Sequence, residues 1–309
     1  MLKTFDNNKV AIIGCGRVGM ALAFSLAHTQ VVNELVLFGR RQSRLNGEAL
    51  DLEHGLSFLN FKHIKPSTNY MDLKESDIVI ITAGAAQKPG ETRLDLVVKN
   101  KAIISEIIPK VVRYAPEAII IMVTNPVDVL TYHAYKLTHL PKGRIFGSGT
   151  LLDTARFRFH LSESLNVNPK SIHAYILGEH GDTSFPVLSS ATVGSQPLNL
   201  FPNFSETKAL EAYEKTRQAA YKIIEAKGYT QYGIASAVSH LVKAIFSDSK
   251  KVLPVSIPLH RYLETISGVA LSVPCVVGRN GVEQILTPKL DWKEKKLLEK
   301  SANTLKQYL

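Results

Sequence analysis

The sequence is poor in cysteine and has no long hydrophobic run. Its two cysteines among 309 residues, Cys15 and Cys275, do not lie in a metal-ligand pattern. Scarce cysteine is typical of a reducing compartment, and we predict no metal site. No apolar run approaches the ~20 residues that a membrane-spanning helix needs, and the first residues do not read as a secretory signal. We therefore expect a cytoplasmic protein that does not associate with membranes.

The sequence also lacks a concentrated block of positive charge, although its formal net charge is +10. The densest basic group, 40–44, is short, and the lysines of 293–300 alternate with glutamates. Such scattered charge does not favour a nucleic-acid partner. Solubility and the attraction of small anionic ligands explain it more simply.

What is present is an ordinary globular composition, 45% hydrophobic and 21% charged, over a length that suggests two domains at ~150 residues each. The first half alternates short apolar segments with helix-forming segments. We predict strands at 9–13, 34–38, 63–66, 77–82, 118–123 and 144–146, and helices at 17–29, 43–59, 92–114 and 128–137. This alternation predicts an α/β fold with a doubly wound parallel sheet covered by helices on both faces.

The pattern changes near Gly149. We predict helices at 153–165, 206–227, 230–248 and 291–307, and strands at 172–177, 191–193, 197–200, 251–257, 269–277 and 282–285. We therefore expect a doubly wound domain over residues 1–147 and a mixed α/β domain over residues 148–309. Because no long linker separates them, the two domains are expected to share an extended interface that holds the active site.

A glycine-rich loop follows the first predicted strand and opens the first predicted helix. Its residues are Gly14, Cys15, Gly16, Arg17, Val18 and Gly19. In a Rossmann domain the first glycine allows the tight turn, the second admits a pyrophosphate, and the third lets helix and strand pack closely. The pyrophosphate then lies at the positive end of the helix. The loop predicts a dinucleotide site, the alternative being a glycine-rich turn without a ligand.

The second predicted strand lacks the acid that usually binds the ribose 2′-hydroxyl about 20 residues beyond such a loop. The strand ends instead in Gly39, Arg40 and Arg41. Glycine leaves room for a 2′-phosphate and arginine can pair with it, so we hypothesise that NADP(H) is accepted or preferred. The alternative is that the arginines are solvated and NAD(H) binds without the ribose contact.

A second motif places a histidine between glycines in GEHGD. Asp153 and Arg156 lie upstream of this His180, three residues apart on one face of a predicted helix. An imidazole can carry a proton near neutral pH, a carboxylate can fix its tautomer, and a guanidinium can bind a carboxylate with two hydrogen bonds. This set suits the interconversion of a 2-keto acid and a 2-hydroxy acid. The alternatives are a structural histidine and an ion pair on a helix surface.

These motifs together resemble the L-lactate/malate dehydrogenase family over essentially the full length, and above all its bacterial L-lactate dehydrogenase branch. The matching segments are GCGRVG, ITAGAAQKPGETRLDLVVKN, VTNPVDVLTY, GSGTLLDTARFR, ILGEHGDTSFPV and KGYTQYG. The resemblance implies a Rossmann domain followed by a lactate-dehydrogenase-type catalytic domain. It also implies reversible hydride transfer between a nicotinamide dinucleotide and pyruvate or L-lactate, as in glycolytic fermentation. The alternatives are a dehydrogenase for malate or a branched-chain 2-hydroxy acid, and an inactive dinucleotide-binding sensor.

The resemblance also implies catalytic roles. His180 would donate and accept the proton at the ketone oxygen, Asp153 would stabilise the charged imidazole, and Arg156 would bind the substrate carboxylate. The loop 84–93 would close over the substrate as a lid and bring in Arg93 to polarise the carbonyl. The alternative for Arg93 is a surface position at a helix start.

Substrate choice is expected to depend on Gln87. In the family, lactate dehydrogenases have Gln at this position, as this chain does, whereas malate dehydrogenases have Arg. A neutral amide tolerates a methyl group, whereas a buried second carboxylate without a cation would be costly. Thr230 would line the methyl end of the pocket, and Asn125 would donate a hydrogen bond near the substrate oxygen.

Further residues are expected to contact the cofactor. The predicted cofactor-binding residues are Gly14, Gly16, Arg17, Val18, Gly19, Gly39, Arg40, Arg44, Tyr70, Gly84, Ala85, Ser105, Val123, Asn125 and Ile234. For Val123 and Ile234, ordinary core packing is the alternative.

The resemblance finally implies a regulatory site. Many bacterial members are homotetramers activated by fructose 1,6-bisphosphate, which an Arg and a His bind across a subunit interface. Arg158 and His173 match these positions. We expect a homotetramer with this effector, the alternatives being a homodimer and an enzyme that does not respond to it.

Overall fold

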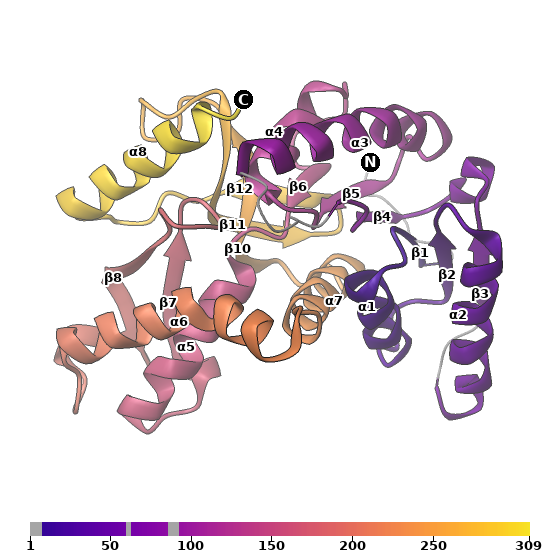
Figure 1. Ribbon diagram of the computed structural model, residues 1–309. Helices are drawn as coiled ribbons and strands as arrows, with labels where there is room; N and C mark the ends of the chain where they lie inside the picture. The colour runs from indigo at the N-terminus through magenta and orange to yellow at the C-terminus, as the bar shows by residue number, and fades with distance from the viewer. Residues whose placement is uncertain (1–7, 60–62, 86–92) are drawn as a thin grey trace.

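A nine-stranded sheet forms the centre of the molecule. The computed structural model describes residues 8–59, 63–85 and 93–309. Within these ranges the strand order of the main sheet is β12-β11-β10-β6-β5-β4-β1-β2-β3, and a second sheet has the order β7-β8-β9. Figure 1 shows the main sheet running through the middle of the molecule with helices on both sides.

The six strands of the main sheet that come first along the chain pair in parallel. They are β1 (Lys9–Ile13), β2 (Glu34–Phe38), β3 (His63–Ser67), β4 (Ile78–Ile81), β5 (Ile119–Met122) and β6 (Ile145–Gly147). Each lies within one or two residues of its predicted position. The chain starts at β1, moves outward to β2 and β3, and then returns to β4 on the other side of β1. Dinucleotides bind in the crevice at such a reversal of strand order.

Helices cover this parallel sheet on both faces, as the sequence predicts. They are α1 (Arg17–Ala27), α2 (Gln42–His54), α3 (Arg93–Tyr114) and α4 (Val127–Lys136). Along β1, Val10 and Ile12 pack with residues of α1, whereas Ala11 and Ile13 pack with residues of α3 and α4. Alternate side chains of a strand point to opposite faces, so a strand buried on both faces reads as a continuous apolar run.

The second half of the chain contributes to both sheets. Its helices and strands are α5 (Leu151–Leu165), β7 (Ile172–Leu177), β8 (Phe185–Val193), β9 (Gln196–Pro197), α6 (Glu206–Lys227), α7 (Tyr232–Phe246), β10 (Lys251–Leu259), β11 (Val269–Gly278), β12 (Gly281–Ile285) and α8 (Trp292–Lys306). Short 3-10 helices lie at η1 (Leu56–Phe58), η2 (Tyr70–Leu73), η3 (Pro169–Ser171) and η4 (Leu198–Leu200). None of the helices in the described ranges is both long and apolar enough to cross a membrane.

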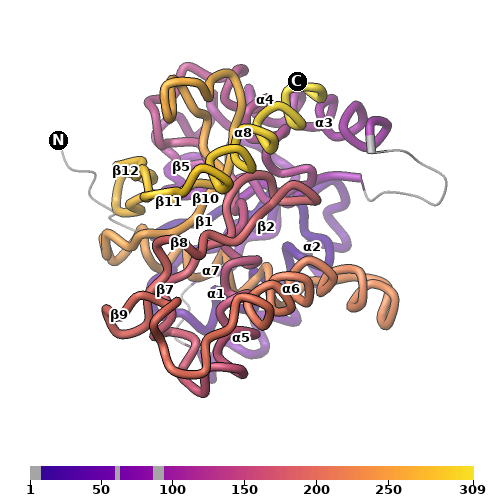
Figure 2. The backbone as a smooth tube through the Cα atoms, turned by 90° about the vertical axis from the view of Figure 1, so that its left-hand side faces the viewer, coloured from indigo at the N-terminus to yellow at the C-terminus, as the bar shows by residue number. Residues whose placement is uncertain are grey.

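The main sheet crosses the predicted domain boundary. Strands β10, β11 and β12 continue it with antiparallel pairing, and the junction is the pair Ser256–Gly147 between β10 and β6. Helix α7 packs against α1 of the first half, and α8 packs against β8 and β11. Figure 2 shows α8 lying across the strands of the second half while α5 and α6 lie together on the opposite side. The two halves therefore share one continuous body.

Three predicted elements of secondary structure were wrong in part. The strand predicted at 191–193 is only the end of β8, which begins at Phe185. The segment 197–200 forms the end of β9 and then η4 instead of a strand. Pro197 has no N–H for a ladder hydrogen bond, and the N–H of Phe201 instead bonds to Leu198 in a tight turn. The helix predicted at 43–59 ends at His54, because Gly55 favours termination and a separate 3-10 turn follows.

Candidate active site

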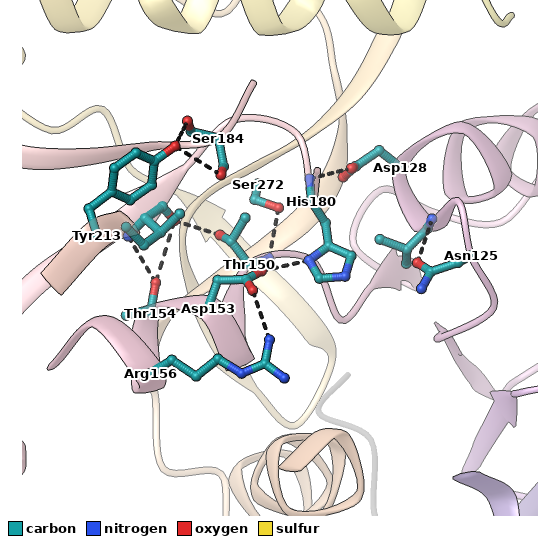
Figure 3. A network of polar contacts seen from close by, with 12 residues as sticks. Asn125, Asp128, Thr150, Asp153, Thr154, Arg156, His180, Ser184, Tyr213 and Ser272 are labelled. Carbon is teal, nitrogen blue, oxygen red and sulfur yellow. Dashed lines mark hydrogen bonds and ion pairs between the residues drawn. The ribbon is translucent and has the colours of Figure 1, made fainter. Parts of the chain in front are cut away.

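A cavity of about 320 Å³ lies between the two halves of the chain. Four predicted site residues line it together: Asn125, Asp153, Arg156 and His180. They come from three separate parts of the chain, and Figure 3 shows their side chains gathered around one space. The fold thus brings the two predicted motifs to one place.

A hydrogen-bonded pair and an ion pair meet at Asp153. The Nδ1 of His180 lies 2.6 Å from Oδ2 of Asp153, and Nη1 of Arg156 lies 3.3 Å from Oδ1 of the same carboxylate. The side chains of Asp153 and Arg156 are each 15% exposed, and that of His180 is 29% exposed. The carboxylate therefore fixes the orientation of both cationic partners at the cavity wall (Figure 3).

The start of α5 is anchored to two strands, which fixes Asp153 and Arg156. The N–H of Thr150 donates to Oγ of Ser272 on β11, at 3.0 Å. The hydroxyl of Thr154 accepts from the N–H of Ile176 on β7, also at 3.0 Å. Both threonines are buried. Because these bonds hold the first turn of the helix, its acidic and basic side chains have one defined direction.

The charges in this site shift the pKa values of its acid and base. The negative charge of Asp153 raises the pKa of His180 to about 9, and the hydrogen bond between the two side chains adds to this shift. Burial of the imidazole opposes the shift but does not cancel it. Burial disfavours the ionised form of Asp153, but the charge and hydrogen bond of His180 and the charge of Arg156 outweigh it and lower its pKa. At neutral pH the pair is therefore an imidazolium next to a carboxylate.

A second carboxylate holds the backbone of the histidine. Oδ2 of Asp128, in the first turn of α4, accepts from the N–H of His180 at 2.7 Å. Asp128 is 2% exposed, and burial raises its pKa to about 6 even though the N–H of His180 favours the charged form. The sequence offers no signal for this contact, which joins residues 52 positions apart.

Helix α8 holds the rest of the histidine loop. The hydroxyl of Ser301 accepts from the N–H of Glu179 at 2.7 Å and donates to the carbonyl of Thr183 at 3.1 Å. The hydroxyl of Thr183 in turn donates to Oε2 of Glu179 at 2.5 Å. Gly178 precedes this loop with φ +92°, and a Cβ there would lie 2.6 Å from Oγ of Ser301. The loop from 178 to 183 is thus fixed at both ends by one buried serine.

One side of the cavity comes from α6, which the motifs did not predict. Its residues there include Tyr213, Thr216, Arg217 and Ile224. The hydroxyl of Tyr213 donates to the carbonyl of Ser184, and Nε of Arg217 pairs with Glu214 at 3.1 Å. A long helix with a partly apolar face is common to many folds, so the sequence alone did not indicate which of its side chains face the site.

The turn before α4 carries Asn125, next to a cis peptide bond to Pro126. A buried amide, Asn100 of α3, joins this turn to the base of the predicted lid. Its Nδ2 donates to the carbonyl of Asn125 at 2.8 Å, and its Oδ1 accepts from the N–H of Ala85 at 2.8 Å. Asn100 was not predicted as a site residue, although it lies in the matching segment ITAGAAQKPGETRLDLVVKN.

Most of the predicted lid lies outside the described residues. Gln87 is in the segment 86–92, which the structure does not describe, and Arg93 is the first residue of α3 with its side chain outside the description. At the base of the lid, a Cβ at Gly84 would lie 2.3 Å from Cγ2 of Thr124. The backbone at Gly84 therefore approaches the turn before α4 too closely for a side chain.

The glycine-rich loop fits a dinucleotide. Gly14 has φ +108°, and a Cβ on Gly19 would lie 2.2 Å from the carbonyl oxygen of Gly14, so both positions need glycine. A Cβ on Gly16 would meet nothing within 4 Å, which leaves open space above the loop. Gly16 is the N-cap of α1 and has no side-chain cap, so the first N–H groups of the helix have no intrahelical acceptor. This is the geometry that receives a pyrophosphate.

Basic and aromatic side chains surround the end of β2. Arg40 is exposed. The pKa of Glu106 on α3 is lowered mainly by its hydrogen bond to Lys110 and by the charge of that lysine, and the charge of Arg40 adds a smaller effect. Nζ of Lys110 lies 5.2 Å from the ring of Tyr70. Arg44 pairs with Glu48 at 3.3 Å. The ring of Tyr70 lies 4.5 Å from that of Phe38, the last residue of β2, and Gly39 and Arg40 follow Phe38 in the chain. No acid occupies the end of the strand.

The remaining predicted cofactor residues have mixed surroundings. Val123 is buried, while Val18 and Ile234 are partly buried against the same core. The hydroxyl of Ser105 lies 2.7 Å from Nε2 of His133 on α4. Thr230, which was predicted to bind the substrate, lies between α6 and α7 and is not among the described residues that line the cavity. The apolar residues of this set therefore belong to the core or its edge.

The two residues of the predicted effector site lie on neighbouring elements. Nε of Arg158 on α5 donates to the carbonyl of Ala174 at 2.8 Å, and its guanidinium lies 5.1 Å from the ring of Tyr175. His173 precedes them on β7 and is exposed. The described residues contain no cluster of acidic, His and Cys side chains that could hold a metal ion.

A dinucleotide-type fold with a paired histidine and a nearby arginine defines a class of nicotinamide-dependent dehydrogenases of small carboxylic acids. Comparison with known proteins agrees. The family model for the NAD-binding domain of lactate/malate dehydrogenases matches residues 8–147, and that for their α/β C-terminal domain matches residues 150–309. The chain belongs to the lactate/malate dehydrogenase family, and the predicted family, fold class and enzyme class are confirmed.

Similar proteins are known at full length. The L-lactate dehydrogenase of Clostridium botulinum (strain Loch Maree / Type A3) is 43% identical over 314 residues, which cover 100% of this chain and 98% of that protein. L-lactate dehydrogenase 1 of Clostridium acetobutylicum is 44% identical over 308 residues, 98% of each chain. The crystal structure of a lactate dehydrogenase from a Medee basin deep-sea metagenome library matches with a TM-score of 0.93 and 39% identity, covering 98% of both chains.

Proposed function

We propose that this chain is an L-lactate dehydrogenase that interconverts pyruvate and L-lactate. The observation that carries the proposal is the 2.6 Å contact between His180 and Asp153, with Arg156 on the same carboxylate. These side chains line one cavity of about 320 Å³, which suits a small carboxylic acid. Full-length relatives named as L-lactate dehydrogenases support the choice. Residues 1–147 would form the dinucleotide domain and residues 148–309 the substrate domain.

The residues of the site supply the proton and orient the substrate. Asp153 occupies Nδ1 of His180, so Nε2 is the nitrogen that gives its proton to the keto oxygen of pyruvate and takes it back from the hydroxyl of lactate. Arg156 keeps N–H groups beyond its contact with Asp153, and these would bind the substrate carboxylate. Arg93 would reach the carbonyl oxygen when the lid closes and water leaves.

The glycine-rich loop would hold the cofactor that this reaction needs. Bound NAD(H) supplies or accepts the hydride at the substrate carbon. Gly14, Gly16 and Gly19 would receive its pyrophosphate, and Tyr70 would lie at its adenosine end. Asn125, in the turn before α4, would lie where nicotinamide and substrate meet.

Substrate preference would follow from Gln87. A neutral amide leaves the site without a cation for a second carboxylate, which disfavours oxaloacetate. We expect Gln87→Arg to move the ratio of kcat/KM values from pyruvate toward oxaloacetate. An unchanged ratio would count against this assignment, and activity on 2-ketoisocaproate would reveal a branched-chain preference instead.

Acceptance of NADP(H) is a further part of the proposal. The end of β2 offers Gly39 and the exposed Arg40 in place of an acid, and an arginine can pair with a 2′-phosphate. We expect comparable or higher kcat/KM with NADPH than with NADH, and Gly39→Asp should reduce the NADPH value selectively. A strong preference of the unmodified enzyme for NADH would contradict this part alone.

We also propose a homotetramer in the cytoplasm that fructose 1,6-bisphosphate activates. Arg158 and His173 would meet their symmetry mates at a subunit interface and bind the phosphates. Arg158 already donates to the carbonyl of Ala174, and its remaining N–H groups suffice for a phosphate. The effector should lower the pyruvate concentration for half-saturation, and Arg158→Gln should abolish that effect. Identical hyperbolic saturation with and without it would refute the regulation.

A direct assay separates enzyme from sensor. Purified protein with NADH and pyruvate should lose the absorbance of the reduced cofactor, and the product should be L-lactate. An inactive protein that still binds NADH would be a dinucleotide sensor.

A further inference from the structure

An arginine of the first half of the chain stacks on a tyrosine of the second half. The guanidinium carbon of Arg17 lies 3.8 Å from the ring centroid of Tyr229. Arg17 is the first residue of α1, directly after the glycine-rich loop, and Tyr229 lies in the short segment between α6 and α7. Helices α1 and α7 pack against each other (Figure 1), so the stack forms where the two halves meet.

The stack gives Arg17 a position that it would otherwise lack. The side chain of Arg17 is exposed, and among the described residues it forms no ion pair. A long cationic side chain in water samples many rotamers, and ordering it costs free energy when it binds an anion. An aromatic face attracts a guanidinium and favours one placement before the ligand arrives. Tyr229 therefore reduces the cost of using Arg17 as a ligand contact.

A cofactor pyrophosphate bound at the glycine-rich loop would be the anion nearest to this placement. The glycine-rich loop leaves open space at Gly16, and Arg17 follows it in the chain. The loop backbone supplies N–H donors but no full positive charge. A guanidinium at this point would add a charge-assisted hydrogen bond to a phosphate oxygen.

We propose that Tyr229 is a positioning residue for cofactor binding, because its ring holds the guanidinium of Arg17 in place to bind the cofactor pyrophosphate. The inference rests on the proposed function, since it takes the dinucleotide as the ligand. It assigns a role in cofactor affinity to a residue of the substrate half. Tyr229 also adjoins Thr230, so the same segment would link the cofactor to the end of the substrate pocket.

A second cation near the same ring provides a matched control. Nζ of Lys227 lies 4.8 Å from the ring of Tyr229 and 4.4 Å from the ring of Tyr232. Lys227 belongs to the end of α6, not to the glycine-rich loop. Removing its charge takes a cation away from the same aromatic ring, but leaves the Arg17–Tyr229 stack intact.

The test is equilibrium binding of NADH and of ADP-ribose, measured by NADH fluorescence and by calorimetry without substrate. Tyr229→Leu removes the aromatic face but keeps apolar volume, and should weaken both ligands about two- to fivefold. Tyr229→Phe keeps the ring and should bind like the unmodified protein. Arg17→Gln should weaken both ligands about tenfold or more, and adding Tyr229→Leu to it should have no further effect. Lys227→Gln should leave both affinities nearly unchanged.

Distinct results separate this inference from the proposed function. The positioning role is wrong if Tyr229→Leu binds both ligands as tightly as the unmodified protein. It is also wrong if Tyr229→Leu weakens binding by the same factor whether or not Arg17→Gln is present. In both cases the dehydrogenase proposal stands. If Lys227→Gln has the same effect as Arg17→Gln, general electrostatic attraction replaces the stack as the cause. If the unmodified protein binds neither ligand, the dinucleotide proposal itself fails.

Discussion

At the scale of single residues, the contact between His180 and Asp153 decides which protonation states are available. The carboxylate raises the pKa of His180 to about 9, so the imidazolium persists through neutral pH. Reduction of a keto acid consumes a proton and needs this charged form, whereas oxidation of a hydroxy acid needs the neutral form. The geometry therefore favours reduction of pyruvate at neutral pH and lets oxidation gain as the pH rises through about 9.

Replacing Asp153 should move this pH dependence in a defined direction. In the unmodified protein, kcat/KM for pyruvate reduction should be level below the pKa of His180 and fall about tenfold per pH unit above it. Asp153→Asn removes the anion that raises this pKa, so the fall should begin at lower pH and the maximal rate should decrease. The check is a pH profile of both proteins at saturating cofactor. The same pH limit in both would show that the carboxylate does not control the histidine.

At the scale of elements, the site depends on helices and strands that are far apart in the chain. Helix α5 supplies the acid and the arginine, the β7–β8 connection supplies the histidine, and Ser301 of α8 fixes both ends of that connection. Asp128 of α4 fixes the histidine backbone from the other half. A change in α8 should therefore reach the chemistry without touching the substrate.

Ser301→Ala should lower kcat for pyruvate reduction by about tenfold to a hundredfold, because a small displacement of His180 is costly. The dissociation constant of NADH should stay the same, since α8 packs against β8 and β11 of the second half. Asn303→Ala, on the exposed side of the same helix, serves as the control and should retain full activity. Equal losses of cofactor affinity and of kcat would instead indicate general destabilisation.

Local sequence patterns predicted the elements that local chemistry determines. The strand at 9–13 and the helix at 206–227 appear where they were predicted. The strand is a continuous apolar run, and the helix begins after the N-cap Ser205 and ends before Gly228, so local sequence is enough to define each. The glycine-rich loop is of the same kind. Contacts between distant segments were not predictable: Ser301 lies 122 positions from Glu179. The joining of β10 to β6 likewise depends on tertiary packing, which apolar periodicity does not encode.

The candidate site was predictable to the extent that motifs mark it. His180, Asp153, Arg156 and Asn125 were proposed from the sequence and lie around one cavity. The α6 side of that cavity and the amide of Asn100 were missed, because a helix face and a buried amide carry no local signature. Family resemblance indicated the chemistry, and the fold brings four of the proposed side chains to one cavity.

At the scale of the whole molecule, one sheet joins the dinucleotide half to the substrate half. Strand β10 pairs with β6 across the predicted boundary, and α7 packs on α1. A ligand that binds only the folded first half should therefore stabilise the second half too. The single tryptophan, Trp292 on α8, reports on the second half.

NADH at about a hundredfold excess over its dissociation constant should add about 2.7 kcal/mol to the free energy of unfolding. The transition followed by Trp292 fluorescence and that followed by far-ultraviolet circular dichroism should coincide and shift together. Two separate unfolding transitions would show that the halves unfold independently, if NADH moves only the transition of the dinucleotide half.

The most direct test of the account is pyruvate-dependent oxidation of NADH by His180→Asn. The amide fills the position but cannot exchange a proton at neutral pH. We predict that kcat falls by about a hundredfold to ten-thousandfold while the dissociation constant of NADH is unchanged. Turnover close to that of the unmodified protein would contradict the assignment of His180 as the proton donor and acceptor.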